Sequence, residues 1–169
     1  MIIRQETQQD YDAVYKMVKK SFAETAYSDG TEADYLNNLR TKDIFIPELS
    51  LLATEDDIVA GQIVLYKTTV KLQNESLIEL VISPLSVHPD YFRRGIATAL
   101  VKAGLEQAQK MGYKAAFLCG DPDFYQKLGF TATYHYEIYH VKDIRAEWCM
   151  VKELESGFLN TISGTIDIE

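Results

Sequence analysis

The residues best suited to chemistry lie at a junction where a strand-like run ends, two arginines follow, and a helical pattern begins at a glycine. Arg93 and Arg94 are the only adjacent arginines in the chain, and Gly95 and Ala97 beside them have little side-chain bulk. The first N–H groups of a helix have no intrahelical partner and lie at the positive end of its dipole. Small residues allow a phosphate to approach those amides closely. The junction therefore predicts a pyrophosphate-binding loop, although a turn with two solvated arginines has the same pattern.

Two common phosphate-binding motifs are excluded at this junction. The chain contains no Gly-x-x-x-x-Gly-Lys-Ser/Thr sequence, so the loop is not that of a nucleoside triphosphatase. The third glycine of the dinucleotide-binding fingerprint is also missing. A diphosphate bound here would have to be presented in another way.

A tyrosine in a second segment could act as an acid. The tripeptide Gly120-Asp121-Pro122 predicts a turn, an N-cap carboxylate and a proline in the first helical position. Helical spacing then places Phe124 and Leu128 inward and Tyr125 on a different side. A tyrosine alone is a weak signal, because the chain has 11 of them and most pack with one end in water.

Together the two segments resemble the GNAT superfamily of acyl-CoA-dependent N-acyltransferases. Residues 87–97 look like its acyl-CoA motif, which ends in Gln/Arg-x-x-Gly-x-Gly/Ala, and residues 120–130 look like its later motif with a tyrosine and a closing Gly-Phe. The opening Ile2-Ile3-Arg4 strand before a helix is also similar, so the resemblance spans essentially the whole chain. Phe92 stands where the family has Gln or Arg, so one side-chain contribution to the loop is missing.

The resemblance implies a site for acetyl-CoA as co-substrate, with no metal. The pantetheine would add to the strand ending at Val87 like an extra strand, and the pyrophosphate would lie on the loop amides. In this family a tyrosine matching Tyr125 protonates the departing thiolate. The residues implied for the cofactor are Leu85, Ser86, Val87, Arg93, Arg94, Gly95, Ile96, Ala97 and Thr98. The implied reaction is direct attack on the thioester by a primary amine, carried by a small molecule or a protein.

The base that takes the proton from the amine is not identified by the sequence. Glu79 on the strand, His88 in the turn and a water molecule are three alternatives. Cys119 ends a buried strand-like run, where cysteine behaves as a small apolar residue, and no cationic partner for a nucleophile is specified. Cys119 and Cys149 are isolated in the sequence from each other and from the histidines, so neither a disulfide framework nor a metal site is predicted.

Two rival functions would use the same segments differently. A non-catalytic acyl-CoA-binding domain, acting as a sensor or an interaction domain, needs the loop but has no need of a placed phenol at Tyr125. A purely structural interaction protein would leave Arg93 and Arg94 solvated, and acyl-CoA would not stabilise its fold.

These residues are positioned by strand and helix patterns that alternate along the chain, so a mixed α/β domain is predicted. Apolar and period-two runs predict strands at 1–6, 50–54, 58–66, 76–87, 115–119, 131–139 and 148–154. Three-and-four spacing predicts helices at 11–22, 32–40 and 95–111, and a short one follows Asp121. Pro84 predicts a bulge or an edge. The resemblance implies a strongly twisted central sheet flanked by helices, with a splayed pair of parallel strands that holds acyl-CoA.

Length and charge limit the remaining possibilities. The 169 residues fit a single domain over 1–169, on a prior of roughly 150 residues per domain. Lys and Arg number 17 against 25 Asp and Glu, and a net charge of −8 argues against nucleic-acid or anionic-membrane partners, which need a basic face. No secretory signal and no apolar run of about 20 residues is visible, so the expected location is the cytoplasm.

Two further segments bear on partners. Residues 22–40 would lie near the acceptor side in this family, and their acidic residues favour a cationic amine. These acidic residues are Glu24, Asp29, Glu32 and Asp34. Residues 157–169 carry alternating isoleucines that could pair with their own domain or with a second subunit, which leaves a homodimer open.

Overall fold

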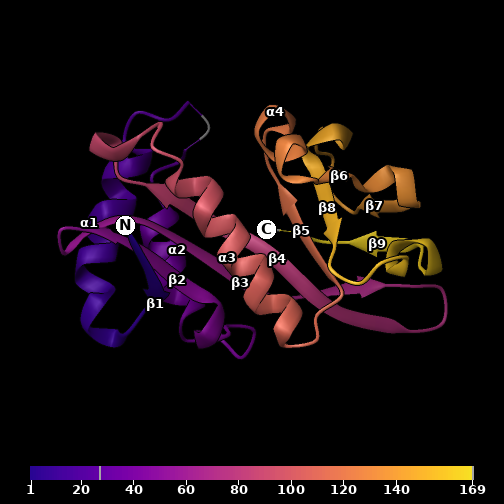
Figure 1. Ribbon diagram of the computed structural model, residues 1–169. Helices are drawn as coiled ribbons and strands as arrows, with labels where there is room; N and C mark the ends of the chain where they lie inside the picture. The colour runs from indigo at the N-terminus through magenta and orange to yellow at the C-terminus, as the bar shows by residue number, and fades with distance from the viewer. Residues whose placement is uncertain (27, 169) are drawn as a thin grey trace. The chain divides into compact units, whose positions relative to one another are not determined.

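Strands and helices follow one another along the chain in the mixed α/β order that the hydrophobic patterns predict (Figure 1). The structure, a computed structural model, describes residues 1–26 and 28–168. The chain divides into two units, which are described separately: Met1–Leu65 with Ser83–Gln107, and Tyr66–Ile82 with Ala108–Glu169. Among the described residues, no helix combines the length and the apolar character needed to cross a membrane.

The first unit contains the N-terminal strands and most of the helical residues. Strand β1 pairs antiparallel with β2, β2 pairs antiparallel with β3, and the end of β4 neighbours β3. Its strands are β1 (Ile2–Gln5), β2 (Ser50–Glu55), the first part of β3 (Ile58–Lys71) and the end of β4 (Ser76–Val87), and the rest of β3 and β4 belongs to the second unit. The helices are α1 (Tyr11–Phe22), α2 (Glu32–Leu39) and α3 (Ile96–Lys110), with short 3-10 turns at Gln8–Asp10, Pro47–Leu49 and Pro89–Tyr91.

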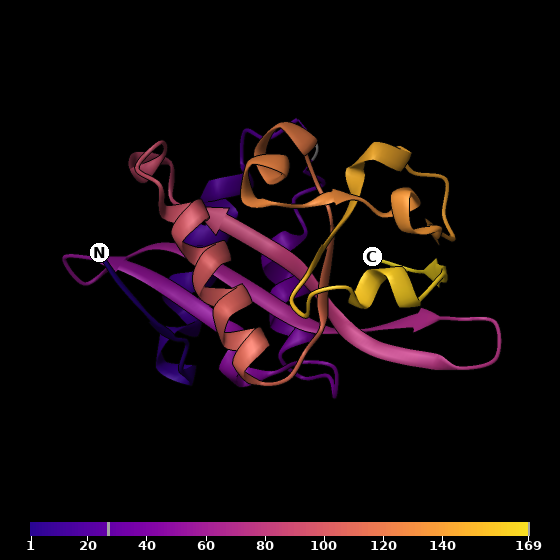
Figure 2. The same cartoon turned by 45° about the vertical axis from the view of Figure 1, so that its right-hand side comes forward.

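Helix α3 packs closely on β3 because two glycines remove the side chains that would separate them (Figure 2). A Cβ atom at Gly61 would lie 2.8 Å from Cγ2 of Ile96 and 3.0 Å from Cδ1 of Leu100. A Cβ atom at Gly104 would lie 2.7 Å from Cδ1 of Leu65. Ile96 and Leu100 are buried in this contact, so the first turn of α3 is fixed against the strands.

The second unit is built around β5 (Ala115–Cys119). This strand runs parallel to β4, with Leu80 opposite Ala116 and Val81 opposite Phe117, and antiparallel to β8. The pairing confirms the parallel strands expected of this fold class. The other elements are α4 (Pro122–Tyr125), β6 (Thr131–Ala132), β7 (Ile138–His140), β8 (Cys149–Glu153) and β9 (Gly164–Ile166). Short 3-10 turns lie at Gln126–Leu128, Thr133–Tyr136, Ala146–Trp148 and Phe158–Thr161.

Most predicted elements are confirmed, with bounds that differ by a residue or two. The helix predicted at 95–111 is α3, and Gly112 follows it with a left-handed φ of 91°. The Asp121 carboxylate caps α4 by accepting the Asp123 N–H at 2.9 Å. Strand β3 is longer than predicted and ends at Lys71. Strand β4 continues through Pro84, which follows a cis peptide bond, and a bulge there stays a prediction.

The single strand predicted at 131–139 is wrong. The chain forms the short strand β6 beside β8, then a 3-10 turn, and then β7, which pairs parallel with β9. Glu137 has a left-handed φ of 57°, and its N–H donates to the Tyr134 carbonyl at 3.1 Å. Strand propensity expresses packing against available neighbours, and the two ends of this segment have different neighbours.

The C-terminal isoleucines pack within their own chain. Strand β9 pairs antiparallel with β3, with Ile166 opposite Val70. Ile166 and Ile168 are both buried. The first of the two predicted alternatives, pairing within the same domain, is therefore the one that the structure shows.

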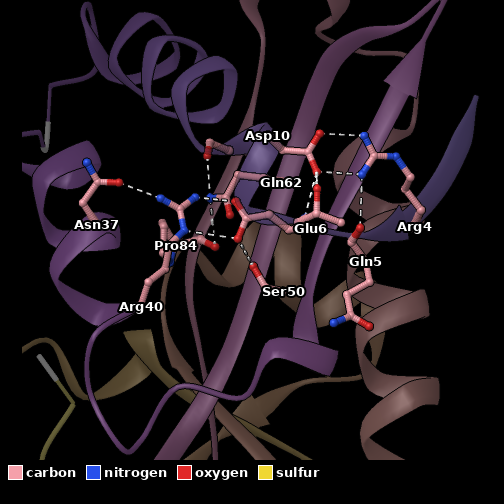
Figure 3. Close-up of polar contacts among 11 residues, drawn as sticks. Arg4, Gln5, Glu6, Asp10, Asn37, Arg40, Ser50, Gln62 and Pro84 are labelled. Atoms are coloured by element: carbon pink, nitrogen blue, oxygen red, sulfur yellow. Dashed lines mark hydrogen bonds and ion pairs between the residues drawn. The ribbon is translucent and has the colours of Figure 1, made fainter.

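A buried ion pair holds the end of α2 against β1 and β2 (Figure 3). Arg40, the residue after α2, donates through Nε and Nη2 to the Glu6 carboxylate. The Ser50 hydroxyl donates to the same carboxylate at 2.7 Å. The guanidinium carbon also lies 4.0 Å from the ring centroid of Tyr11 in α1. Because the Arg40 and Glu6 side chains are only 4% and 2% exposed, these contacts replace water around both charges.

Replacing Arg40 with alanine is expected to lower the free energy of unfolding by about 3–5 kcal/mol, because the Glu6 carboxylate would stay buried without its cation. Arg4→Ala is the matched control. Arg4 also donates two hydrogen bonds to one carboxylate, that of Asp10, at 2.7 and 2.8 Å, but its side chain is 42% exposed. Its loss should cost about 1 kcal/mol or less. Urea denaturation followed by circular dichroism measures both values, and equal losses would contradict the assignment.

Candidate active site

The loop before α3 presents backbone N–H groups that no helical carbonyl accepts. Arg93 (φ 63°) and Gly95 (φ 77°) are both left-handed, with Arg94 between them. The first hydrogen bond of α3 runs from the Ala99 N–H to the Gly95 carbonyl at 3.0 Å, so the N–H groups of residues 96–98 come before the helical ladder. Turns with left-handed residues and helix N-termini both form concave anion-binding sites. A Cβ atom at Gly95 would meet nothing within 4 Å, so the space beside the loop is open.

Several cationic side chains lie around this loop. The guanidinium carbon of Arg94 lies 5.0 Å from the ring centroid of Tyr91, and that ring meets the His88 ring edge-on at 5.5 Å. The Lys20 ammonium of α1 lies 3.4 Å from Nε2 of His88. Arg93 is exposed. An aromatic face orders a guanidinium without removing it from water, so positive charge stays available to a ligand here.

Among the described residues, the pairing of β5 with β4 includes Leu80 and Val81 but not residues 85–87 at the end of β4. The His88 N–H donates to the Ala60 carbonyl on β3 at 2.8 Å. Peptide groups of successive strand residues point alternately to the two sides of the strand, so those of Val87 and Leu85 point away from β3. An extended ligand that carries amide groups can pair with them as an added strand.

Gln62 on β3 fixes the end of β4, and the sequence analysis did not identify it. Its buried side-chain amide donates to the Ser86 hydroxyl at 2.8 Å and to the Pro84 carbonyl at 3.4 Å (Figure 3). Burying a side-chain amide costs free energy unless it is hydrogen-bonded. Gln62 is the one polar residue between Gly61 and Tyr66, and a polar residue within an apolar strand is the sequence signal that could have indicated its positioning role.

Tyr125 is held by aromatic packing in the second unit. Its ring lies edge-on to Phe124 and Phe130, with centroid distances of 4.8 and 5.6 Å. A Cβ atom at Gly120 would lie 2.5 Å from Cε2 of Tyr125, so a glycine is needed beneath the ring. Burial raises the pKa of the Tyr125 phenol to about 12. Within the described part of this unit, no residue hydrogen-bonds to its hydroxyl.

The two side chains considered as bases already have partners. One oxygen of the buried Glu79 carboxylate accepts the backbone N–H groups of Lys114 and Ala115, at 2.9 and 3.1 Å, where β5 begins. Burial raises the pKa of this carboxyl group. Nδ1 of His88 accepts the Asp90 N–H at 3.1 Å. Both side chains therefore have structural roles. Water, the third candidate for the base that takes the proton from the amine, requires neither of them.

The site residues lie on the elements where the sequence places them. The nine cofactor residues occupy the end of β4, the loop and the first turn of α3, all within the first unit, and Tyr125 ends α4 in the second unit. Phe92, at the position where the family has Gln or Arg, is 52% exposed and offers no polar group to a phosphate.

Comparisons with known proteins point to one family. The family model described as acetyltransferase (GNAT) domain matches residues 2–133. The uncharacterized N-acetyltransferase YhbS of Escherichia coli K12 is 31% identical over 175 residues, which cover 99% of this chain and 95% of YhbS. The crystal structure of E. coli YhbS in complex with CoA has a TM-score of 0.86 and 26% identity, and covers 99% of this chain and 89% of that one. A GNAT acetyltransferase from Brucella melitensis in complex with acetyl-CoA has a TM-score of 0.78 and 24% identity, with 99% and 95% covered.

These matches extend well beyond the two motifs. The family model covers most of the chain, and YhbS aligns with nearly all of it. The resemblance inferred from the motifs is therefore confirmed: the chain belongs to the GNAT family of acetyltransferases, enzymes that transfer an acetyl group from acetyl-CoA.

Proposed function

We propose that this chain binds acetyl-CoA on its first unit and transfers the acetyl group to a primary amine. The observation that carries the proposal is the set of N–H groups at residues 96–98, next to the left-handed residues Arg93 and Gly95. The pyrophosphate accepts hydrogen bonds from these amides and from the arginines. The pantetheine amides pair with the outward peptide groups of β4 between Leu85 and Val87.

The reaction proceeds by direct attack on the thioester. A neutral amine forms the C–N bond at the carbonyl carbon, and the negative charge that develops on oxygen is stabilised by preorganised backbone N–H groups. Collapse of this intermediate breaks the C–S bond and releases the thiolate of CoA. The Tyr125 hydroxyl donates to the sulfur, and water takes the proton from the amine.

The pKa values determine how Tyr125 contributes. A thiol that resembles cysteine has a pKa of about 8.5, whereas that of the Tyr125 phenol is raised to about 12. Complete proton transfer from phenol to thiolate is uphill by 12 − 8.5, about 3.5 units, or roughly 5 kcal/mol. Tyr125 therefore acts chiefly by hydrogen-bonding the sulfur while its charge develops, and the thiolate is finally protonated from solvent.

The acceptor is a cationic primary amine on a small molecule or a protein. The support is a hollow in the first unit, lined by the end of α1, residues of the following loop and the start of α2, with Lys19, Phe22 and Glu32 among the lining residues. Of the four acidic residues noted in this region, Glu32 alone lines the hollow. Two of the others are engaged locally, because Asp29 accepts from Thr31 and Asp34 accepts from Tyr15.

A thiol-release assay with acetyl-CoA tests this function. The acceptors are a polyamine, an aminoglycoside and a lysine peptide, with an alcohol of similar size as the negative control. The expected result is CoA release that depends on the amine, with the acetylated product identified by mass spectrometry. Acetyl-CoA at 100 times its Kd should stabilise the fold by about 2.7 kcal/mol. If this stabilisation is observed but no amine causes thiol release, the chain would be a cofactor sensor instead.

Gly95→Ala is expected to raise the Kd for CoA about tenfold or more, because an L side chain disfavours the left-handed turn that aligns the amides. Gly112→Ala is the matched control. Gly112 follows the other end of α3, its φ of 91° is also left-handed, and an added Cβ there also meets nothing within 4 Å. Both variants should lose similar stability in thermal melts. Isothermal titration with CoA should show weaker binding for Gly95→Ala alone.

Tyr125→Phe is expected to lower kcat by roughly 10²- to 10³-fold, the usual cost of losing one preorganised donor to a developing negative charge. The KM for acetyl-CoA should change little, because the aromatic packing is kept and only the hydroxyl is lost. Tyr134→Phe serves as the control, since Tyr134 lies on an exposed turn of the same unit. Steady-state kinetics with saturating amine separates the two constants. An unchanged kcat would remove Tyr125 from the mechanism.

The pH dependence of kcat follows from the raised pKa of Tyr125. The protonated phenol is the active form, so its contribution is lost only as pH rises through about 12. With both substrates saturating, kcat should not decline between pH 8 and pH 10. The opposite result is a fall in kcat with an apparent pKa near 10 in the wild type but not in Tyr125→Phe. It would show that the pKa of the phenol is not raised.

A further inference from the structure

Two cysteines that are far apart in the sequence face each other in the second unit. Cys119 ends β5, Cys149 begins β8, and the antiparallel register places them directly opposite one another. Both are free thiols, Cys119 exposed and Cys149 buried. The proposed acetyl transfer uses neither thiol, so the pair has no role in that mechanism.

The pairing geometry suits a disulfide. The Gly120 N–H donates to the Trp148 carbonyl at 2.9 Å, which makes these two residues a hydrogen-bonded pair. Hydrogen-bonded and non-hydrogen-bonded pairs alternate along an antiparallel ladder, so Cys119 and Cys149 form a non-hydrogen-bonded pair, whose Cα atoms typically lie about 4.5 Å apart. Disulfides span Cα separations of about 4.4–6.8 Å. The S–S bond can therefore form with little movement of either strand.

The polar surroundings favour thiol chemistry. Contact with the Cys119 thiol, helped by the Thr133 hydroxyl and by the charge of His140, lowers the pKa of Cys149. The same contact and burial raise the pKa of Cys119, which the charge of Lys142 opposes. Cys149 is thus the better thiolate, and Cys119 is the thiol that a reagent in solution can reach.

We propose that Cys119 and Cys149 form a reversible intrachain disulfide, with a small-molecule disulfide such as oxidised glutathione as the oxidant. The Cys149 thiolate takes the proton of the Cys119 thiol as the Cys119 sulfur attacks one sulfur of the oxidant, which forms a mixed disulfide and releases one glutathione thiolate, and Cys149 then gives that proton to solvent. The Cys149 thiolate then attacks the Cys119 sulfur, which closes the protein disulfide and releases the second glutathione thiolate. The two cysteines lose two electrons, the oxidant gains them, and the two cysteine protons are balanced by the two glutathione thiols formed.

This disulfide would lie at the base of the turn that carries Tyr125. Gly120 follows Cys119 directly, and the ring of Tyr125 packs on it. The S–S bond restrains the peptide between Cys119 and Gly120, and the ring of Tyr125 lies so close to Gly120 that even a small rotation of this peptide moves the phenol. The effect on catalysis rests on the proposed function: oxidation should lower kcat at least tenfold and leave the KM for acetyl-CoA nearly unchanged, because the cofactor residues lie in the first unit.

Oxidised glutathione is the probe, and intact-protein mass spectrometry after alkylation is the readout. The wild type should lose two hydrogens in mass and block both cysteines from alkylation, and dithiothreitol should reverse both changes. Cys149→Ser should stop at one glutathione adduct on Cys119, and Cys119→Ser should react much more slowly. Cys119 is exposed, so Cys119→Ser keeps the comparison available if Cys149→Ser does not fold. A persistent glutathione adduct or two unreacted thiols in the wild type would overturn the disulfide.

Kinetics of the oxidised and reduced chains separate this proposal from the proposed function. A fall in kcat that dithiothreitol restores, and that Cys119→Ser does not show, supports the coupling to Tyr125. Full kcat in a chain shown by mass to be oxidised would overturn that coupling. Absence of acetyl transfer in both redox states would overturn the proposed function, while the mass measurement would still decide the disulfide.

Discussion

The N–H groups at the start of a helix must find acceptors outside that helix, and the cofactor site proposed for this chain depends on that constraint. At the start of α4 the Asp121 carboxylate is the acceptor, and before α1 the Asp10 carboxylate accepts the Thr7 N–H. Among the described residues, no side chain accepts from the first N–H groups of α3. Gly95 has no side chain, and the guanidinium groups of the two preceding arginines only donate. The N–H groups at this end of the helix are therefore open to water or to a ligand, and the diphosphate of acetyl-CoA is a ligand of the matching chemistry.

Local geometry, and not the overall charge, makes this end of α3 suitable for an anion. The chain carries a net charge of −8, which by itself repels phosphate. Charges farther apart than a Debye length, about 8 Å at physiological ionic strength, are largely screened, whereas groups in direct contact are not. The contact groups are backbone amides and the arginine pair, with Asp90 as a neighbouring carboxylate that lies 3.9 Å from Lys20. The close packing of α3 on Gly61 keeps these amides in place before any ligand binds, which reduces the ordering cost of binding.

The sequence predicts the features that depend on single residues and their immediate neighbours. The helix predicted at 95–111 ends before Gly112, where left-handed backbone favours glycine, and Asp121 begins a helix because its carboxylate can cap. Features that depend on pairing between distant segments were missed. The strand predicted at 131–139 breaks because its ends pair with different strands, and Gln62 acquires its role from a strand about 24 residues away. The two cysteines meet only through the register of β5 and β8, which no local pattern specifies.

The structure also distinguishes packing from chemistry at Tyr125. Its ring is held by Phe124, Phe130 and the bare backbone of Gly120, and a phenylalanine would make all of these contacts. The hydroxyl adds nothing to that packing, because no described residue of its own unit hydrogen-bonds to it. The apolar surroundings instead raise its pKa, which keeps a donor proton on the oxygen at every physiological pH. The Tyr125 hydroxyl is therefore not needed for packing, stays protonated and has no hydrogen-bond partner among the described residues of its unit. Such a group is suited to donate to a charge that exists only during the reaction, such as the developing thiolate of CoA.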